Sequence, residues 1–167
     1  MPQYIKPKFF NNETPPHIFT LILLAGLSPL SMNFFLPSLP SMSFHFQTSP
    51  AFLGLSVGIF LATSAIFQII IGPLSDHCGR RPVVLWSLIV FILVTILVPF
   101  VTSIAVFFIL RALQATAAAC IVVSRAIVRD TTTNTAESGQ QISYVTMGMA
   151  VAPMLGLSFA GFIDSWF

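Results

Sequence analysis

The stretch AFLGLSVGIFLATSAIFQIIIGPLSDHCGRRPVVLWSLIVFILVTILVPF, residues 51–100, decides the fold. It consists of two apolar runs that a short charged turn joins. A helix that crosses the hydrocarbon layer of a membrane needs about 20 mostly apolar residues, because the layer is about 30 Å thick and a helix rises about 1.5 Å per residue. Each run has that length, so the stretch predicts two membrane-spanning helices with a tight turn between them.

The same pattern extends over the whole chain of 167 residues, of which 56% are hydrophobic and 7% are charged. No water-soluble fold covers this much apolar surface. We therefore expect an all-α integral membrane protein with about five transmembrane helices, in which the polar stretch 131–140 is a loop. The expected spans are approximately residues 18–36, 51–74, 83–100, 104–123 and 142–163.

The basic residues indicate the orientation of the chain, because Lys and Arg concentrate in the short loops on the cytoplasmic side of a membrane. The connections 37–50 and 101–103 contain none. We therefore expect residues 1–17 to form a cytoplasmic N-terminal tail. A cleaved signal peptide fits poorly, because the first apolar run is long and no small-x-small cleavage site follows it. The basic residues before the first span and in the alternate connections are Lys6, Lys8, Arg80, Arg81, Arg125 and Arg129.

Several function classes are excluded. The Lys and Arg residues form no stripe, so no nucleic-acid partner is expected. Cys78 and Cys120 lack the spacing of a zinc site, and we expect no metal and no cofactor. The chain has neither a membrane-embedded Ser–His or carboxylate pair nor a Gly-rich phosphate loop, so we do not expect an enzyme. The function classes that remain are the transport of a solute and a purely structural role.

The charged turn has the sequence GPLSDHCGRRP, residues 72–82. Gly79 provides a backbone that is free to adopt positive φ, and Gly72 permits the close approach of another helix. Pro82 suits the first turn of the helix that follows, because its missing N–H needs no partner there. The turn is therefore expected to end one helix and to begin the next.

The turn also carries charges of opposite sign, since Asp76 precedes Arg80 and Arg81. At a membrane surface such a set allows an ion pair to be made and broken between conformations. The run resembles the cytoplasmic loop signature of the major facilitator superfamily, Gly-x-Leu-x-Asp-x-x-Gly-Arg-Arg. His77 departs from the relatives, which commonly have Arg there, and makes the turn less positive. The alternative is a generic positive-inside turn.

Arg111 lies inside the fourth apolar run, where a charged side chain costs about 2.5–3.5 kcal/mol on insertion scales. Gln114 follows at i+3 on the same helix face, which predicts a polar patch toward the bundle interior or a cavity. The segment RALQATAAA, residues 111–119, resembles the signature Arg-x-x-Gln-Gly-x-Gly of proton-coupled members of this family, with alanines in place of both glycines. The resemblance implies a role in proton or substrate coupling. The alternative is a structural Arg that caps carbonyls or pairs with a neighbouring span.

Small residues recur every four positions on the fifth span, which lets another helix approach closely. Within this stripe, Pro153 frees a carbonyl and allows the helix to bend. The segment resembles the antiporter signature Gly-x-x-x-Gly-Pro-x-x-Gly-Gly of exporters in the superfamily, with two glycines substituted. A packing stripe with no transport meaning is the alternative. The stripe consists of Gly148, Ala152, Gly156 and Ala160.

The end of the first span, NFFLPSLP, residues 33–40, resembles the pattern Asp-x-x-Leu-Pro-x-Leu-Pro of bicyclomycin-resistance and chloramphenicol-exporter proteins. Asn33 stands where these relatives usually have Asp. An amide does not exchange a proton near neutral pH, so the coupling role of that carboxylate is missing from this chain. All five Asp and Glu residues lie in expected tails or loops, so we expect no acid inside the membrane.

The resemblance implies a multi-pass exporter of the bacterial inner membrane, in which drug-like molecules and protons exchange by alternating access. Arg111, Gln114 and Asn33 are its candidate coupling residues, and the lipid bilayer surrounds it. The family fold has about twelve spans, so residues 18–167 are expected to form an incomplete N-terminal six-helix half that does not export alone. The alternative is a non-transporting remnant, or a subunit that needs a separately encoded second half.

Overall fold

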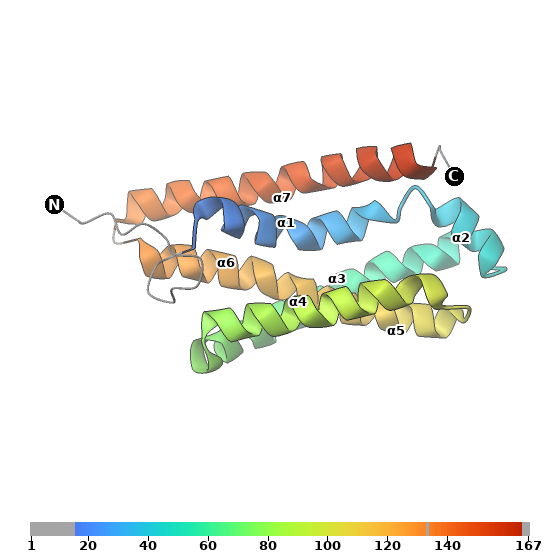
Figure 1. The fold of residues 1–167 in the computed structure, drawn as a ribbon, viewed down its shortest axis with the longest axis horizontal. Helices are drawn as coiled ribbons and strands as arrows, with labels where there is room; N and C mark the ends of the chain where they lie inside the picture. The colour runs from blue at the N-terminus through green and yellow to red at the C-terminus, as the bar shows by residue number, and fades with distance from the viewer. Residues whose placement is uncertain (1–15, 133, 165–167) are drawn as a thin grey trace.

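The computed structural model of the chain describes residues 16–132 and 134–164. Figure 1 shows that the helices run roughly along one long axis and that successive long helices alternate in direction. Two 3₁₀ turns extend or join helices: η1, Val98–Phe100, follows α4, and η2, Ala115–Ala117, connects α5 to α6. The helices are α1 Ile18–Phe34, α2 Leu39–His45, α3 Pro50–Cys78, α4 Arg80–Leu97, α5 Ile104–Gln114, α6 Ala118–Thr131 and α7 Thr135–Asp164.

The described residues contain four helical segments that are long and apolar enough to cross a membrane. Helices α1 and α2 pass the same test as a pair that is bent by 58°, which makes a fifth. The prediction of an all-helical membrane protein with about five spans is confirmed. The four single segments are Pro50–Cys78, Arg80–Phe100, Ile104–Thr131 and Thr135–Phe162.

Two stretches that were expected to be loops are largely helical. The predicted loop 131–140 is wrong, because α6 ends at Thr131 and α7 already begins at Thr135. A helix depends on paired backbone groups and does not require apolar side chains. At the start of α7, the Ala136 N–H donates a 3.1 Å hydrogen bond to the Asn134 Oδ1, which stabilises the first turn. The connection 37–50 likewise contains α2, which has a proline in its first turn.

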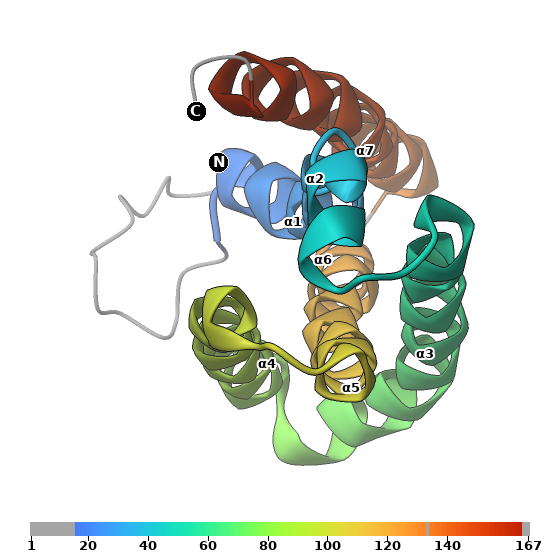
Figure 2. The same cartoon turned by 90° about the vertical axis from the view of Figure 1, so that its right-hand side faces the viewer.

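The span formed by α5, η2 and α6 lies at the centre of the described bundle. Figure 2 shows it end-on between α3 and α4, with α1 on its third side. In its most apolar 18-residue stretch 61% of the residues are buried, against 17–22% in the other three single segments. Ala115, Ala117, Ala118 and Ala119 are fully buried, so the small side chains allow the neighbouring helices to approach. The helix that carries Arg111 is therefore the one that the others surround.

Helix α7 packs along α1 through the predicted stripe of small residues. A Cβ atom added at Gly148 would overlap Ile22, and one added at Gly156 would lie 2.9 Å from Leu30. On the facing side, a Cβ atom at Gly26 would lie 3.2 Å from that of Ala152. The prediction that this stripe lets another helix approach closely is confirmed, and α7 continues without interruption through Pro153.

Replacement of Gly148 tests this packing. Although Ala is a better helix former than Gly by about 1 kcal/mol, we expect Gly148→Ala to lower the melting temperature, because overpacking typically costs about 1–3 kcal/mol. The β-branched Ile22 has few rotamers in a helix with which to move away. Melting is measured in detergent by the reaction of a thiol dye with the buried Cys120, in a Cys78→Ser background because Cys78 is exposed.

Gly161→Ala is the matched control on the same helix, because nothing lies within 4 Å of a Cβ atom there. We expect it to leave the melting temperature unchanged or to raise it. Equal melting temperatures for the Gly148→Ala and Gly161→Ala variants would contradict the close approach of α1 to α7.

Candidate functional site

A cavity of about 500 Å³ lies where α1 and α2 face α4 and α5. Its lining is mostly apolar and contains several aromatic rings, among them Phe34, Phe91 and Phe107. Arg111 and Gln114, which the sequence singled out, both line it. The predicted polar patch toward a cavity is therefore present, and it consists of one cation and one amide in an aromatic surrounding.

Arg111 is 3% exposed, and the structure provides its guanidinium with two kinds of compensation, a hydrogen bond and cation–π attraction. Its Nη1 donates a 2.9 Å hydrogen bond to the Gln114 Oε1. Its central carbon lies 4.0 Å from the ring centroid of Phe35 and 5.1 Å from that of Phe60, within the range of cation–π attraction. These contacts offset part of the cost of a charge at membrane depth.

Thr95 extends the polar contacts of Arg111 from α5 to α4. Gln114 donates from Nε2 to the Thr95 Oγ1 over 3.0 Å, and that hydroxyl donates over 2.7 Å to the Phe91 carbonyl. The Gln114 amide is thereby held in one orientation, with its oxygen toward Arg111. Thr95, Phe35 and Phe60 were not predicted; the signal for Thr95 was a hydroxyl inside an apolar run, a signal that Ser87 of the same run shares.

Asn33 is on the last turn of α1 and is not among the described residues that line the cavity. Its Nδ2 donates a 2.8 Å hydrogen bond to the Pro29 carbonyl, one turn earlier on the same helix. The structure therefore brings Arg111 and Gln114 together, whereas the Asn33 amide bonds within its own helix. A role of Asn33 in coupling stays a prediction.

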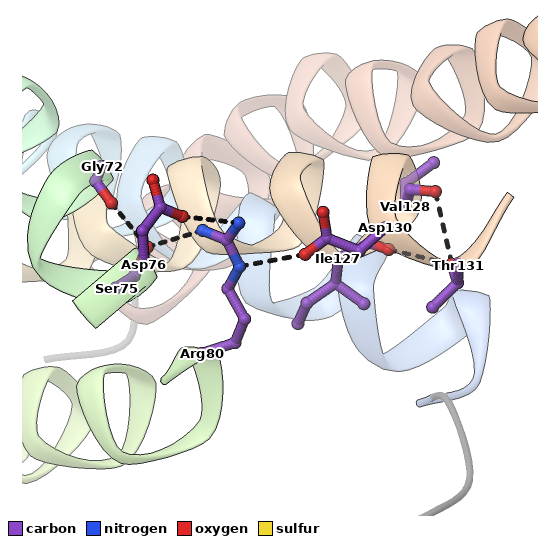
Figure 3. A network of polar contacts seen from close by, with 8 residues as sticks. All are labelled: Gly72, Ser75, Asp76, Arg80, Ile127, Val128, Asp130 and Thr131. Carbon is purple, nitrogen blue, oxygen red and sulfur yellow. Dashed lines mark hydrogen bonds and ion pairs between the residues drawn. The ribbon is translucent and has the colours of Figure 1, made fainter. Parts of the chain in front are cut away.

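The charged turn at the other end of the bundle is built around Arg80, as Figure 3 shows. Its Nη2 lies 2.7 Å from the Asp76 Oδ1, and its Nε donates over 3.1 Å to the Asp130 Oδ2. Its Nη1 donates over 2.7 Å to the Ser75 Oγ. Arg80 therefore joins the ends of α3, α4 and α6. Asp130 was expected in a loop but lies on the last turn of α6, which places its carboxylate within reach.

Three details of the predicted turn can be compared with the structure. Gly79 has φ of 91°, as expected, and it separates α3 from α4. The expected close approach at Gly72 is wrong for the described residues, since nothing lies within 4 Å of an added Cβ atom; its carbonyl instead accepts a 2.9 Å bond from Ser75. Arg81 is exposed and makes no ion pair within residues 16–132 and 134–164, so the ion pairs of the turn belong to Arg80.

Comparison with known proteins gives a consistent result. Residues 21–167 match the family described as Major Facilitator Superfamily. The chain is 32% identical over 151 residues to the chloramphenicol resistance protein of Pseudomonas aeruginosa, which is 88% of this chain and 36% of that protein. It is 36% identical to an uncharacterized MFS-type transporter of Bacillus subtilis, over 87% of this chain and 36% of that protein.

Multidrug resistance protein D of Escherichia coli is 26% identical to the chain over 149 residues, which is 89% of this chain and 38% of that protein. The chain therefore spans little more than a third of the length of these curated relatives.

The pair between Arg80 and Asp130 is expected to couple α4 to α6 weakly. We predict that Arg80→Ala and Asp130→Ala show a coupling free energy of about 0.2–1 kcal/mol in a double-mutant cycle, since both side chains are partly exposed. The coupling falls at high salt because ions screen the pair. Unfolding by a denaturing detergent, followed by circular dichroism, measures it. The cycle of Arg81→Ala with Asp130→Ala is the control and should give none; equal coupling in both cycles would refute the assignment to Arg80.

Proposed function

The chain belongs to the Major Facilitator Superfamily, and from this premise we propose that it forms the first membrane helices of a transporter that exports drug-like molecules in exchange for protons. The observation that carries the proposal is the buried Arg111 in the wall of the aromatic cavity. A charge at membrane depth is costly, and in membrane proteins such residues mark substrate or ion pathways. Relatives named for resistance to chloramphenicol and to multiple drugs support export of small molecules.

We propose that the two ends of the bundle have different roles in alternating access. The cavity near α2 accepts the substrate, and the Arg80 contacts with Asp76 and Asp130 hold the opposite end closed in one conformation. Partly exposed ion pairs are suited to this role, because their small net free energy lets them break at little cost. The support is geometric, since Arg80 contacts residues of both α3 and α6.

The proposed location is the bacterial inner membrane, with the N-terminal tail, residues 1–17, in the cytoplasm. The excess of Lys and Arg in alternate connections supports this orientation. Residues 18–167 then act as part of an N-terminal transporter domain. A family transporter has its cavity between two halves, so we propose that further helices, from the same or a separate polypeptide, complete the cavity.

Drug accumulation in bacteria that lack their own exporters tests the function. We expect the full product of the gene to lower chloramphenicol accumulation, and a proton uncoupler to abolish the effect. Arg111→Ala should raise accumulation to the level of cells without the gene, because it removes the charged group of the cavity. Glu137→Gln, which removes an exposed charge on α7 outside both the cavity and the Arg80 contacts, is the control and should export normally.

Two outcomes would overturn parts of the proposal. Uncoupler-sensitive export by Arg111→Ala would exclude the coupling role of this residue. Export by residues 1–167 alone would contradict the need for further helices. A gene product that never lowers accumulation of any drug would favour the non-transporting remnant or subunit.

A further inference from the structure

We infer that the cavity selects amphipathic ligands that carry a carboxylate, which Arg111 binds through its Nε and Nη2, and that it discriminates against cationic ligands. The inference rests on the proposed function and specifies the substrate class of that site. Two observations support it: the Arg111 side chain has N–H groups without a hydrogen-bond acceptor among the described residues, and Arg111 is the only charged residue among the described residues that line the cavity.

The Arg111 guanidinium has donors that the described residues leave unused. Its Nη1 is bonded to Gln114, but neither Nε nor Nη2 has an acceptor within the described part of the chain, although both atoms are buried. Buried donors are nearly always paired in folded proteins, and an unpaired charged donor is particularly costly. An acceptor that arrives with a ligand removes this cost, so the site favours ligands that bring one.

The two unpaired nitrogens define what kind of acceptor fits. In a guanidinium, the N–H groups of Nε and Nη2 lie on one edge and point in parallel, and this spacing matches the two oxygens of a carboxylate. Gln114 occupies Nη1 and is itself fixed by Thr95, so the guanidinium presents the other edge in a set orientation. A planar two-oxygen group satisfies both donors at once, whereas a single carbonyl satisfies one.

The surroundings of Arg111 indicate the rest of the ligand. Phe35 and Phe60 lie against the guanidinium but offer no oxygen to its N–H groups. Phe35 follows the last helical residue of α1 and lines the cavity, so a ligand that reaches the guanidinium also meets this ring. The remaining apolar and aromatic lining suits a ring system attached to the carboxylate.

The charge of the cavity explains the discrimination. Arg111 is the only charged residue among the described residues that line it, and Asn33 donates its amide to Pro29 instead of supplying a carboxylate nearby. A cationic drug would therefore meet a positive charge in a medium of low dielectric with no neighbouring anion in this lining. The positive charge of Arg111 attracts a carboxylate, whereas it repels a cation.

Binding of two ligands with the same ring and opposite charge tests the inference. The full chain in lipid nanodiscs is dialysed against 1-naphthylacetate, or against (1-naphthylmethyl)trimethylammonium, and binding to empty nanodiscs is subtracted. We expect the carboxylate to bind at least about tenfold more tightly than the ammonium compound, as charge-assisted bidentate pairs are the strong ones. The neutral 1-naphthylacetamide should bind more weakly than the acid.

Variants of Arg111 separate the geometry of its fork from its charge. Arg111→Lys keeps the charge but loses the parallel N–H groups, and we expect about a tenfold loss of naphthylacetate affinity. Circular dichroism melting of this variant verifies that it is folded. Arg129→Gln, which removes an exposed charge outside the cavity, should leave the affinity unchanged.

The outcomes distinguish this inference from the proposed function. If both ligands bind equally, or if Arg111→Lys binds naphthylacetate as the parent chain does, the selection by Arg111 is wrong while a ligand cavity remains. If neither ligand binds above empty nanodiscs, the cavity of this chain is not a ligand site, and the proposed export through it loses its support.

Discussion

The burial of the Arg111 guanidinium in an apolar bundle is the constraint on which the arrangement of the helices depends. A charge that faces lipid is unfavourable, so the helix that carries it belongs in the interior. The α5–α6 span accordingly lies between α3, α4 and α1, while the other spans keep large apolar faces outward. Its alanines are fully buried and allow the neighbouring helices to approach closely.

The cavity lies where two differently packed groups of helices meet. Helices α1 and α7 are held together by small residues, a mode of association that does not need a hydrophobic driving force in lipid. Helices α3, α4 and α6 are joined at one end by the polar contacts of Arg80. Between these groups, α1 faces α4 and α5 across the aromatic cavity with Arg111 at its wall. Close packing thus joins one group of helices along its length, and the ion pairs of Arg80 join the other group at one end.

The predictions that the structure corrected share a physical origin. Apolar periodicity locates the hydrocarbon layer, but helices continue beyond it whenever their backbone groups are paired, which is why α6 and α7 occupy most of the expected loop 131–140. Gly72 was assigned a packing role from its residue type, although close approach depends on which helix faces it, and no described residue does so. Thr95 on α4 and Phe35 at the end of α1 are distant from Arg111 in sequence. Their contacts with Gln114 and Arg111 depend on how those helices pack, so the sequence pattern did not reveal them.

The sequence by itself determined the all-helical membrane class with about five spans, the positive φ at Gly79 and the placement of Arg111 and Gln114 on one helix face. These follow from local physics: the thickness of the bilayer, the conformational freedom of glycine, and the spacing of residues on one helix face. Only the tertiary structure decided that α1 is the partner of the small-residue stripe, that Asp130 completes the contacts of Arg80, and that Asn33 stays outside the cavity. Each of these depends on how separate helices are placed and rotated against one another, which no single segment encodes.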